Sequence, residues 1–381
     1  MDDEGKISRS GRRMATSGAL LLSMILVFPQ SSHAEAGDWI VTQLPQVVPE
    51  SSQVIWKNPY VLWCSKDGLF LYDIRTRALK TITNSRVSPS IINGDVVYSN
   101  QNRDLRSRSA QLFVYNIADA TLTPIPQLAS IFGFACGGGV VVWNAAPPSV
   151  DLCIYDTDRG KVTQIKRTGK FENDLATDGK IIVWVRPEPG GIYGGARAIF
   201  AYDIASGGET RIAGGNGRTA GNPVICGSSV LFAAQWINPD KTSGGGVFRY
   251  DLAQHRGTQI GNTFLAGEIS VSPDGRAAAW SEAPGIGNPQ VRFYDLRTGK
   301  SEPMTHDEFW NIDVMISNRA IAWNHFAGGR ITMRATDIYD RETSSVSVLS
   351  GYTLHGLDGD AALLTREDGQ LFLARPPEKA P

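Results

Sequence analysis

The sequence lacks the short motifs on which many enzymes and cofactor proteins depend. It has only four cysteines and five histidines, and no C-x-x-C or Cys/His spacing typical of a metal site. No G-x-S-x-G run occurs, so a hydrolase of that class would lack its nucleophile turn. The glycine runs at 190–195 and 244–246 match no phosphate-binding motif. We therefore assign no catalytic residue and expect no cofactor and no bound metal.

Neither sign of charge is in excess. The chain has 37 Lys and Arg residues against 38 Asp and Glu residues, so its overall field gives no reason to expect nucleic-acid binding. A local basic cluster, Arg103, Arg106 and Arg108, could bind an acidic partner, with a solvated charge run as the alternative.

The first 34 residues have the pattern of an export signal. A basic region ending at Arg13 precedes the apolar stretch 19–28, and Ser32-His33-Ala34 supplies a small-x-small cleavage site. The apolar stretch is shorter than the roughly 20 residues of a membrane-spanning helix. We therefore expect cleavage after Ala34, with a retained anchor as the alternative. This predicts a bacterial protein of the periplasm or the exterior, without a membrane span after signal removal.

The cysteines would then reside in an oxidising compartment, where disulfides can form. Three of them lie within or at the ends of apolar runs, and the fourth precedes a Gly-Ser turn; they are Cys64, Cys136, Cys153 and Cys226. A bridge needs Cα atoms roughly 4.4–6.8 Å apart, which residues of non-adjacent strands rarely satisfy. We expect buried free thiols, with a bridge as the alternative.

The most regular feature is a tyrosine followed by Asp or Asn near the end of an apolar run. The seven pairs begin at Tyr72, Tyr115, Tyr155, Tyr202, Tyr250, Tyr294 and Tyr339. The intervals between them are 43, 40, 47, 48, 44 and 45 residues. A period of this length built from short strands is the signature of a β-propeller.

A second repeated run, ending in an aromatic residue, precedes each tyrosine pair and occurs once more near the C-terminus. Its aligned positions are Trp63, Tyr98, Trp143, Trp184, Phe232, Trp280, Trp323 and Leu363. The last unit has no outer strand of its own, and the segment 40–44 resembles the outer strands of other units. We therefore predict an all-β propeller domain at 35–377, with eight blades of four antiparallel strands, the N-terminal strand closing the last blade and a tail at 378–381. Seven blades are the alternative.

Recurrence at one place in every unit favours a structural role for these residues. We expect the aromatic positions to pack blade against blade. We expect the Asp or Asn after each tyrosine to accept hydrogen bonds from the backbone of the turn that follows.

Two runs carry a recognisable motif. The runs Ser272-Pro273-Asp274-Gly275, followed by a strand ending at Trp280, and Tyr294-Asp295-Leu296-Arg297-Thr298-Gly299-Lys300 resemble TolB-type repeats of the wider TolB-like and WD-type propeller superfamily. The resemblance covers most of the chain after the signal. It implies an exported bacterial propeller that binds a partner.

Function is expected where the connections are longest. Because strand direction alternates, the long segments 100–110, 144–150, 186–197, 235–245, 281–289 and 324–330 all open on one face, here called the long-loop face. Polar residues near the start of the innermost strands could form an acidic ring there. The candidates are Asp174, Asn222, Glu268 and Asp313, with Glu172 nearby.

Three histidines fall in the last three units. His306, His325 and His355, with Asp313, could converge on a metal or act in catalysis at the mouth of the channel. Our leading hypothesis remains a monomeric, non-enzymatic scaffold that binds an envelope or extracellular protein or peptide, or a glycan. The alternative is a polysaccharide lyase or hydrolase using these histidines.

Overall fold

The computed structural model of the protein describes fourteen segments of the chain. They are 39–49, 52–85, 87–92, 95–101, 110–126, 131–145, 151–167, 173–188, 196–215, 218–238, 240–262, 264–283, 287–326 and 334–377. The chain divides into two units, 1–34 and 35–381, and all described residues belong to the second. The predicted signal and tail lie outside the described residues, as do Glu172, Arg103, Arg106 and Arg108.

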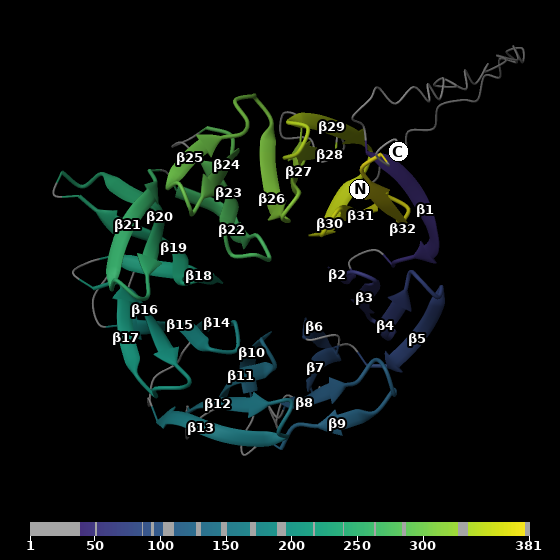
Figure 1. Cartoon of the computed structure of the whole chain (residues 1–381), viewed down its shortest axis with the longest axis horizontal. Helices are drawn as coiled ribbons and strands as arrows, with labels where there is room; N and C mark the ends of the chain where they lie inside the picture. The colour runs from purple at the N-terminus through teal and green to yellow at the C-terminus, as the bar shows by residue number, and fades with distance from the viewer. Residues whose placement is uncertain are drawn as a thin grey trace, which may run out of the picture. The chain divides into compact units, whose positions relative to one another are not determined.

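The described residues form β-strands joined by turns, without a helix, and the predicted all-β class is confirmed. Each repeat contributes a first strand that lies nearest the centre of the circle of sheets (Figure 1). These innermost strands are β2 (Gln53–Lys57), β6 (Ser88–Ile92), β10 (Ile131–Gly137), β14 (Asn173–Thr177), β18 (Thr219–Cys226), β22 (Phe264–Val271), β26 (Trp310–Ile316) and β30 (Thr353–Asp358).

Two antiparallel strands follow in each repeat. The second strands are β3 (Tyr60–Ser65), β7 (Asp95–Gln101), β11 (Val140–Ala145), β15 (Ile181–Glu188), β19 (Ser229–Ile237), β23 (Ala277–Ala283), β27 (Ala320–Phe326) and β31 (Ala361–Thr365). The third strands are β4 (Gly68–Asp73), β8 (Ala110–Tyr115), β12 (Asp151–Asp156), β16 (Ala196–Asp203), β20 (Ser243–Asp251), β24 (Gln290–Asp295), β28 (Arg334–Asp340) and β32 (Gln370–Arg375).

The outer strands complete the sheets. Seven follow their third strand directly: β5 (Ala78–Thr83), β9 (Leu122–Pro124), β13 (Lys161–Arg167), β17 (Glu209–Ala213), β21 (Arg256–Gly261), β25 (Lys300–Pro303) and β29 (Ser345–Ser350). The last outer strand is β1 (Ile40–Val47), which pairs antiparallel with β32. The predicted closure by the N-terminal strand is confirmed.

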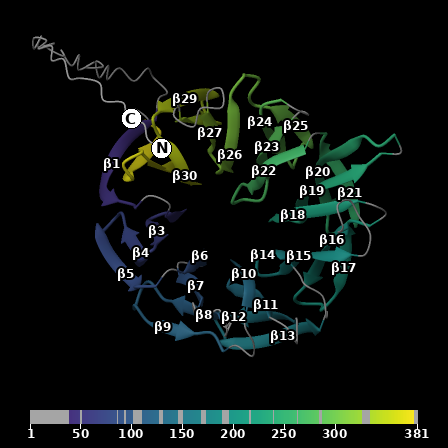
Figure 2. The same cartoon turned by 180° about the vertical axis from the view of Figure 1, so that it is seen from behind.

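The innermost strands contact one another in chain order, and β30 contacts β2, so the circle closes (Figures 1 and 2). The strands pair into six four-stranded sheets and one eight-stranded sheet. In the larger sheet a single parallel bridge, Arg197 with Thr219, joins two groups of four. Counting that sheet as two blades or one gives eight or seven, so the number of blades stays a prediction.

The aligned aromatic positions form the core, as predicted. All eight side chains are buried, from Trp63 to Leu363. Several stack on the residue opposite them in the third strand, as Trp63 does on Phe70 with ring centroids 5.6 Å apart. Aromatic pairs of this kind contribute about 0.5–1.5 kcal/mol beyond the area that they bury.

The acidic or amide residue of every tyrosine pair caps its turn, which confirms the structural prediction. Asp73 Oδ1, for example, accepts hydrogen bonds from the backbone N–H groups of Arg75 and Thr76. The same bonds recur at Asn116, Asp156, Asp203, Asp251, Asp295 and Asp340. These turns therefore define the face opposite the long loops.

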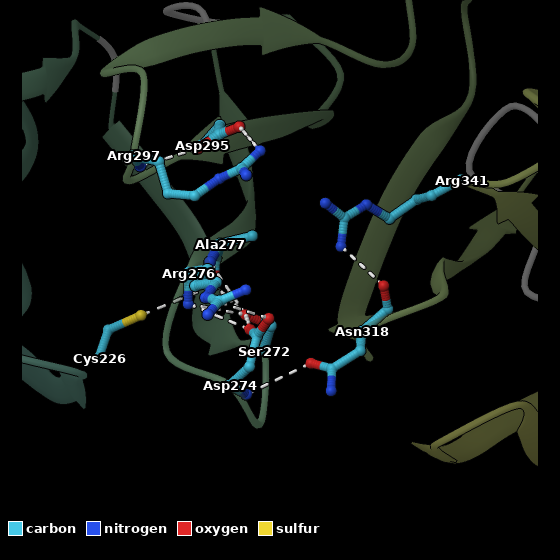
Figure 3. A network of polar contacts seen from close by, with 9 residues as sticks. All are labelled: Cys226, Ser272, Asp274, Arg276, Ala277, Asp295, Arg297, Asn318 and Arg341. Atoms are coloured by element: carbon cyan, nitrogen blue, oxygen red, sulfur yellow. Dashed lines mark hydrogen bonds and ion pairs between the residues drawn. The ribbon is translucent and has the colours of Figure 1, made fainter.

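The Ser272–Gly275 turn joins neighbouring repeats, as Figure 3 shows. Ser272 Oγ donates to Asp274 Oδ1 at 2.7 Å and accepts from the Ala277 N–H at 2.9 Å. The N–H of Asp274 donates to Asn318 Oδ1 of the next repeat at 3.3 Å. The motif that resembles TolB repeats thus has a structural role in this chain.

All four cysteines are free, as expected, and three are buried while Cys136 is partly buried. The thiol of Cys226 donates to the Ala277 carbonyl of the next repeat at 3.6 Å (Figure 3). Burial raises the pKa of Cys136 and of Cys226 to about 12. These thiols serve as inter-repeat packing groups. Across the described segments, no helix is long and apolar enough to cross a membrane.

Candidate functional site

Three of the predicted ring residues lie at a recurrent irregularity of the innermost strands. Asp174, Asn222 and Asp313 have positive φ angles of 49°, 52° and 54°. At each place the register between the first and second strands shifts, as at a β-bulge. Asp and Asn tolerate this left-handed conformation better than other residues with a side chain. Backbone geometry therefore explains the residue types, and it leaves all three side chains exposed.

Each of these residues has its own surroundings on the inner strands. A Cβ built on Gly221, next to Asn222, would lie 3.9 Å from Asp174 Oδ2. Glu268 is exposed at the corresponding register shift of β22. Asp313 accepts a hydrogen bond from Asn324 Nδ2 at 3.1 Å. The described contacts therefore place Asp174 beside the strand of Asn222 and Asp313 beside Asn324, while Glu268 stands at an equivalent exposed position.

Asn324 connects β27 to both adjacent strands and to the next repeat. Its Oδ1 accepts from the backbone N–H of Leu354 at 2.8 Å and from Thr336 Oγ1 at 3.1 Å, while its Nδ2 binds Asp313. The side chain is buried. Its full set of partners fixes the position of Asp313, a role that the sequence did not indicate.

His355 occupies the register shift of β30. Its Nε2 lies 2.7 Å from Thr365 Oγ1. Burial lowers the pKa of this imidazole, and the negative charge of Asp313 opposes that effect without reversing it. His355 is therefore neutral at neutral pH and is suited to hydrogen bonding.

His325 forms the most distinctive polar pair in the described part of the chain. Its Nδ1 lies 2.8 Å from Asp337 Oδ2, and its ring stacks on Phe309 with centroids 5.0 Å apart. Asp337 is 7% exposed and lies opposite Trp323 in the register, with the Trp323 indole as its second polar neighbour. Burial raises the pKa of this carboxyl and outweighs His325 and Trp323, which lower it, while the charge of Asp307 raises it further.

His306 does not join this pair. It is exposed, whereas the neighbouring Asp307 accepts hydrogen bonds from Asn311 Nδ2 at 2.8 Å and from the Phe309 N–H at 3.0 Å. Within the described residues no three His, Cys, Asp or Glu side chains gather as a metal site would require. The three histidines thus have different surroundings, and the convergence considered as the alternative is not found among the described residues.

Asp337 and a second charged residue, Arg292, were missed by the sequence analysis although a signal was present. Both stand two residues before the tyrosine of their pair, where the other repeats carry Phe70, Phe113, Cys153, Phe200 and Phe248. In the register, Arg292 lies opposite Trp280 and Asp337 opposite Trp323. Each has a partner two residues after that tryptophan, Glu282 for Arg292 and His325 for Asp337.

Apolar side chains are also exposed on the long-loop face. Trp310, at the start of β26, is 48% exposed, and Ile237, at the end of β19, is 50% exposed. Trp310 directly follows Phe309, which covers His325. An exposed tryptophan beside hydrogen-bonding groups is typical of a recognition surface.

No protein-family model and no curated protein matches the sequence. Solved structures do match, and they show the propeller fold. Tricorn protease is 14% identical over 84% of this chain, with a TM-score of 0.54. Dipeptidyl peptidase 4 of Porphyromonas gingivalis is 9% identical over 87% of it, with a TM-score of 0.59. This chain spans 37% of tricorn protease and 51% of the matched Pyrococcus horikoshii acylaminoacyl peptidase.

Other matches extend over nearly the whole of both chains. An oligogalacturonate lyase from Vibrio parahaemolyticus is 10% identical over 90% of this chain and 98% of its own, with a TM-score of 0.54. TolB from Acinetobacter baumannii is also a neighbour, at 20% identity and a TM-score of 0.38. The propeller fold rests on the matches with higher scores.

Proposed function

We propose that the protein is an exported, non-enzymatic propeller that binds a peptide segment of an envelope or extracellular protein on its long-loop face. The observation that carries this proposal is the 48% exposure of Trp310 beside the Phe309–His325 stack. Buried aromatic anchors dominate the energy of protein interfaces, and a free tryptophan of this kind supplies one. The exposed polar residues of the inner strands would orient the peptide.

The remaining parts of this proposal come from the sequence. Residues 1–34 would direct export and be removed, leaving a monomer in the periplasm or outside the cell. A glycan is the other ligand class that an exposed tryptophan with polar neighbours would suit.

An aromatic photo-crosslinking residue at position 310, which keeps an aromatic ring in place of the tryptophan side chain, tests the scaffold proposal in envelope extracts. The matched control carries the same residue at Val348, a 57% exposed side chain of the outer strand β29. We expect a crosslinked partner at position 310 alone. In a capture assay without the crosslinking residue, Trp310→Ala should lower the amount of this partner bound at least tenfold relative to the unmodified protein, and Val348→Ala should not lower it. Equal crosslinking at both positions would contradict the proposal.

A second candidate function is cleavage of an acidic polysaccharide, and the His325–Asp337 pair favours it. A carboxylate that holds Nδ1 of an imidazole leaves Nε2 to exchange a proton with a substrate. Two oligogalacturonate lyases, one of them described with manganese, share the fold. Since the described residues hold no three-ligand cluster, we derive no step through a metal.

Incubation with polygalacturonate separates the two functions. The lyase hypothesis predicts unsaturated oligosaccharides that disappear with His325→Ala, together with metal bound to the purified protein. The scaffold proposal predicts neither product nor dependence on His325, while the crosslink at position 310 remains.

A further inference from the structure

A groove of about 540 Å³ lies where the circle of sheets is closed. It is bordered by β1 and by the end of β32 on one side and by the turn after β4 on the other (Figure 1). Its lining residues are Thr42, Gln43, Leu44, Pro45, Tyr72, Ile74, Arg77, Leu373 and Arg375. The volume is in the range of pockets that hold small organic ligands.

The connectivity of the chain distinguishes this place from the other junctions. In seven repeats the third strand continues through a Tyr-Asp or Tyr-Asn turn into its outer strand. In the closing sheet the outer strand β1 comes from the opposite end of the chain, so no such turn follows β32. The closing sheet is thus the only one of the described sheets in which the third and outer strands are not consecutive in the chain.

One arginine of the groove departs from the repeat. Arg375 lies two residues after Leu373, the partner of Leu363, and so occupies the position of the repeated tyrosine. Arg77, with a φ of 61°, occupies a turn position that is left-handed in all seven tyrosine turns, where three repeats carry glycine and the other three carry Ala120, His255 and Ser344. An arginine in this left-handed conformation costs roughly 1 kcal/mol relative to glycine.

Within the described residues, Arg77 and Arg375 form no ion pair or hydrogen bond, and no Asp or Glu lines the groove. The arginine three residues after the tyrosine behaves differently, because Arg75 pairs with Asp73 at 3.7 Å, as Arg297 does with Asp295 at 3.3 Å. The other lining side chains are apolar or neutral, with Leu44 and Tyr72 buried beneath.

We propose that this groove binds an organic anion, a carboxylate attached to an apolar group. Two guanidinium groups on one groove can bind a carboxylate through charge-assisted hydrogen bonds. The groove is far larger than an inorganic anion requires, and Leu44, Ile74 and Leu373 offer contacts to a hydrocarbon portion. A fatty acid and an acidic, leucine-rich peptide both have this chemistry.

This site is independent of the proposed function. The groove lies at the Tyr-Asp turn end of the strands, whereas Trp310 lies at the long-loop end. Trp310→Ala should therefore leave binding in the groove unchanged, and the failure of either proposal would leave the other standing.

Calorimetric titration of the full chain at low salt tests the inference with octanoate, with an acetylated Leu-Leu-Asp peptide and with inorganic phosphate. We expect one of the two carboxylates, or both, to bind at least tenfold more tightly than phosphate, and the stronger of the two identifies the source. Arg375→Tyr restores the residue of the repeat, and Arg77→Gly introduces the glycine that three other turns carry at this position, so both variants should fold. Each should weaken carboxylate binding about tenfold, because a charge-assisted hydrogen bond is lost.

Arg159→Gln is the matched control. Arg159 is 81% exposed in the equivalent turn of another repeat. Its substitution removes the same charge at a place away from the groove. Its binding should equal that of the unmodified protein. The inference is overturned if neither carboxylate binds, if phosphate binds as tightly as they do, or if Arg77→Gly and Arg375→Tyr weaken binding no more than Arg159→Gln.

Discussion

Five repeats and two repeats differ in the third-strand residue that lies opposite the aligned aromatic position. In β4, β8, β12, β16 and β20, the residue two before the tyrosine is Phe or Cys and packs against the core. In β24 and β28 it is Arg292 or Asp337. A charge is tolerated at this position only where the second strand supplies its partner, because an unpaired buried charge is strongly destabilising.

The two charged repeats also differ from each other. Glu282 accepts from Arg292 and from the Trp280 indole, and Arg292 also donates to Ser301, so this group is well satisfied. In the other repeat, Asp337 has His325 as its partner and the Trp323 indole as a further polar neighbour. The two groups therefore use the same positions with the charges exchanged between the strands.

The largest effect should follow from Arg292→Ala. Glu282, which is 5% exposed, would lose its counter-ion, and the free energy of unfolding in urea should fall by about 3–5 kcal/mol. Arg297→Ala removes an arginine that is 67% exposed in its ion pair and should cost under about 1 kcal/mol. Equal losses in the two variants would show that the buried pair is no different from a surface pair.

Asp337→Asn should give a smaller effect that depends on pH. Because burial raises the pKa of Asp337, its protonated form is favoured in the folded state. Its contribution to stability is complete below its ordinary value of 3.8 and is lost as pH rises through the higher folded value. As pH rises from about 3 to about 7, the free energy of unfolding of the variant should therefore increase by about 1 kcal/mol relative to that of the unmodified protein.

Asp295→Asn serves as the control with the opposite slope. Burial raises the pKa of Asp295, but hydrogen bonds from Arg297 and Thr298 outweigh that effect, and the pKa is lowered. As pH rises, the free energy of unfolding of the unmodified protein should increase relative to that of this variant. A common slope for both variants would refute the assignment of a raised pKa to Asp337.

Converting the His325–Asp337 pair to the apolar pattern of the other repeats should change the free energy of unfolding little. The double substitution His325→Ala and Asp337→Phe gives this repeat the residue types found at Ala234 and Phe248. Buried ion pairs replaced by well-packed apolar groups are often as stable or more so, and we expect a change within about 1 kcal/mol of zero or a gain. A loss comparable to that of Arg292→Ala would show that the pair holds the fold.

The smallest effect is expected when the native protein is treated with a thiol reagent, because the thiols of the inter-repeat contacts are shielded. With pKa values of about 12, Cys136 and Cys226 should not react with a maleimide at pH 8 in the native protein. Both should react in urea, as mass spectrometry would show. Rapid native labelling would mean that these contacts open readily.

Local features could be predicted from the sequence, because their causes lie within a few residues. The repeat, the capping of each turn by Asp or Asn and the burial of the aligned aromatics follow from spacing alone. Even the closing strand was visible, since 40–44 resembles other outer strands. The left-handed conformation of Asp174 and Asp313 was not, because a bulge depends on the register with the second strand.

The pairing of His325 with Asp337 depends on the register of β27 and β28 across a long connection. Comparing the repeats position by position would have singled out Asp337 but not its partner. The groove could not be predicted from the sequence. Its two arginines lie about 300 residues apart and come together only when the two ends of the chain meet.

The pairing of β1 with β32 also sets the order in which the protein can fold. Gln370 Nε2 donates to the Gln46 carbonyl across 324 residues of chain. Such contacts form slowly, because the entropy of closing the loop must be lost before they are gained. A nascent chain therefore carries an unpaired β1 until β32 has been made, and that exposed edge is open to aggregation. Joining the two ends and opening the chain at 158–160 should make this pairing local and accelerate refolding.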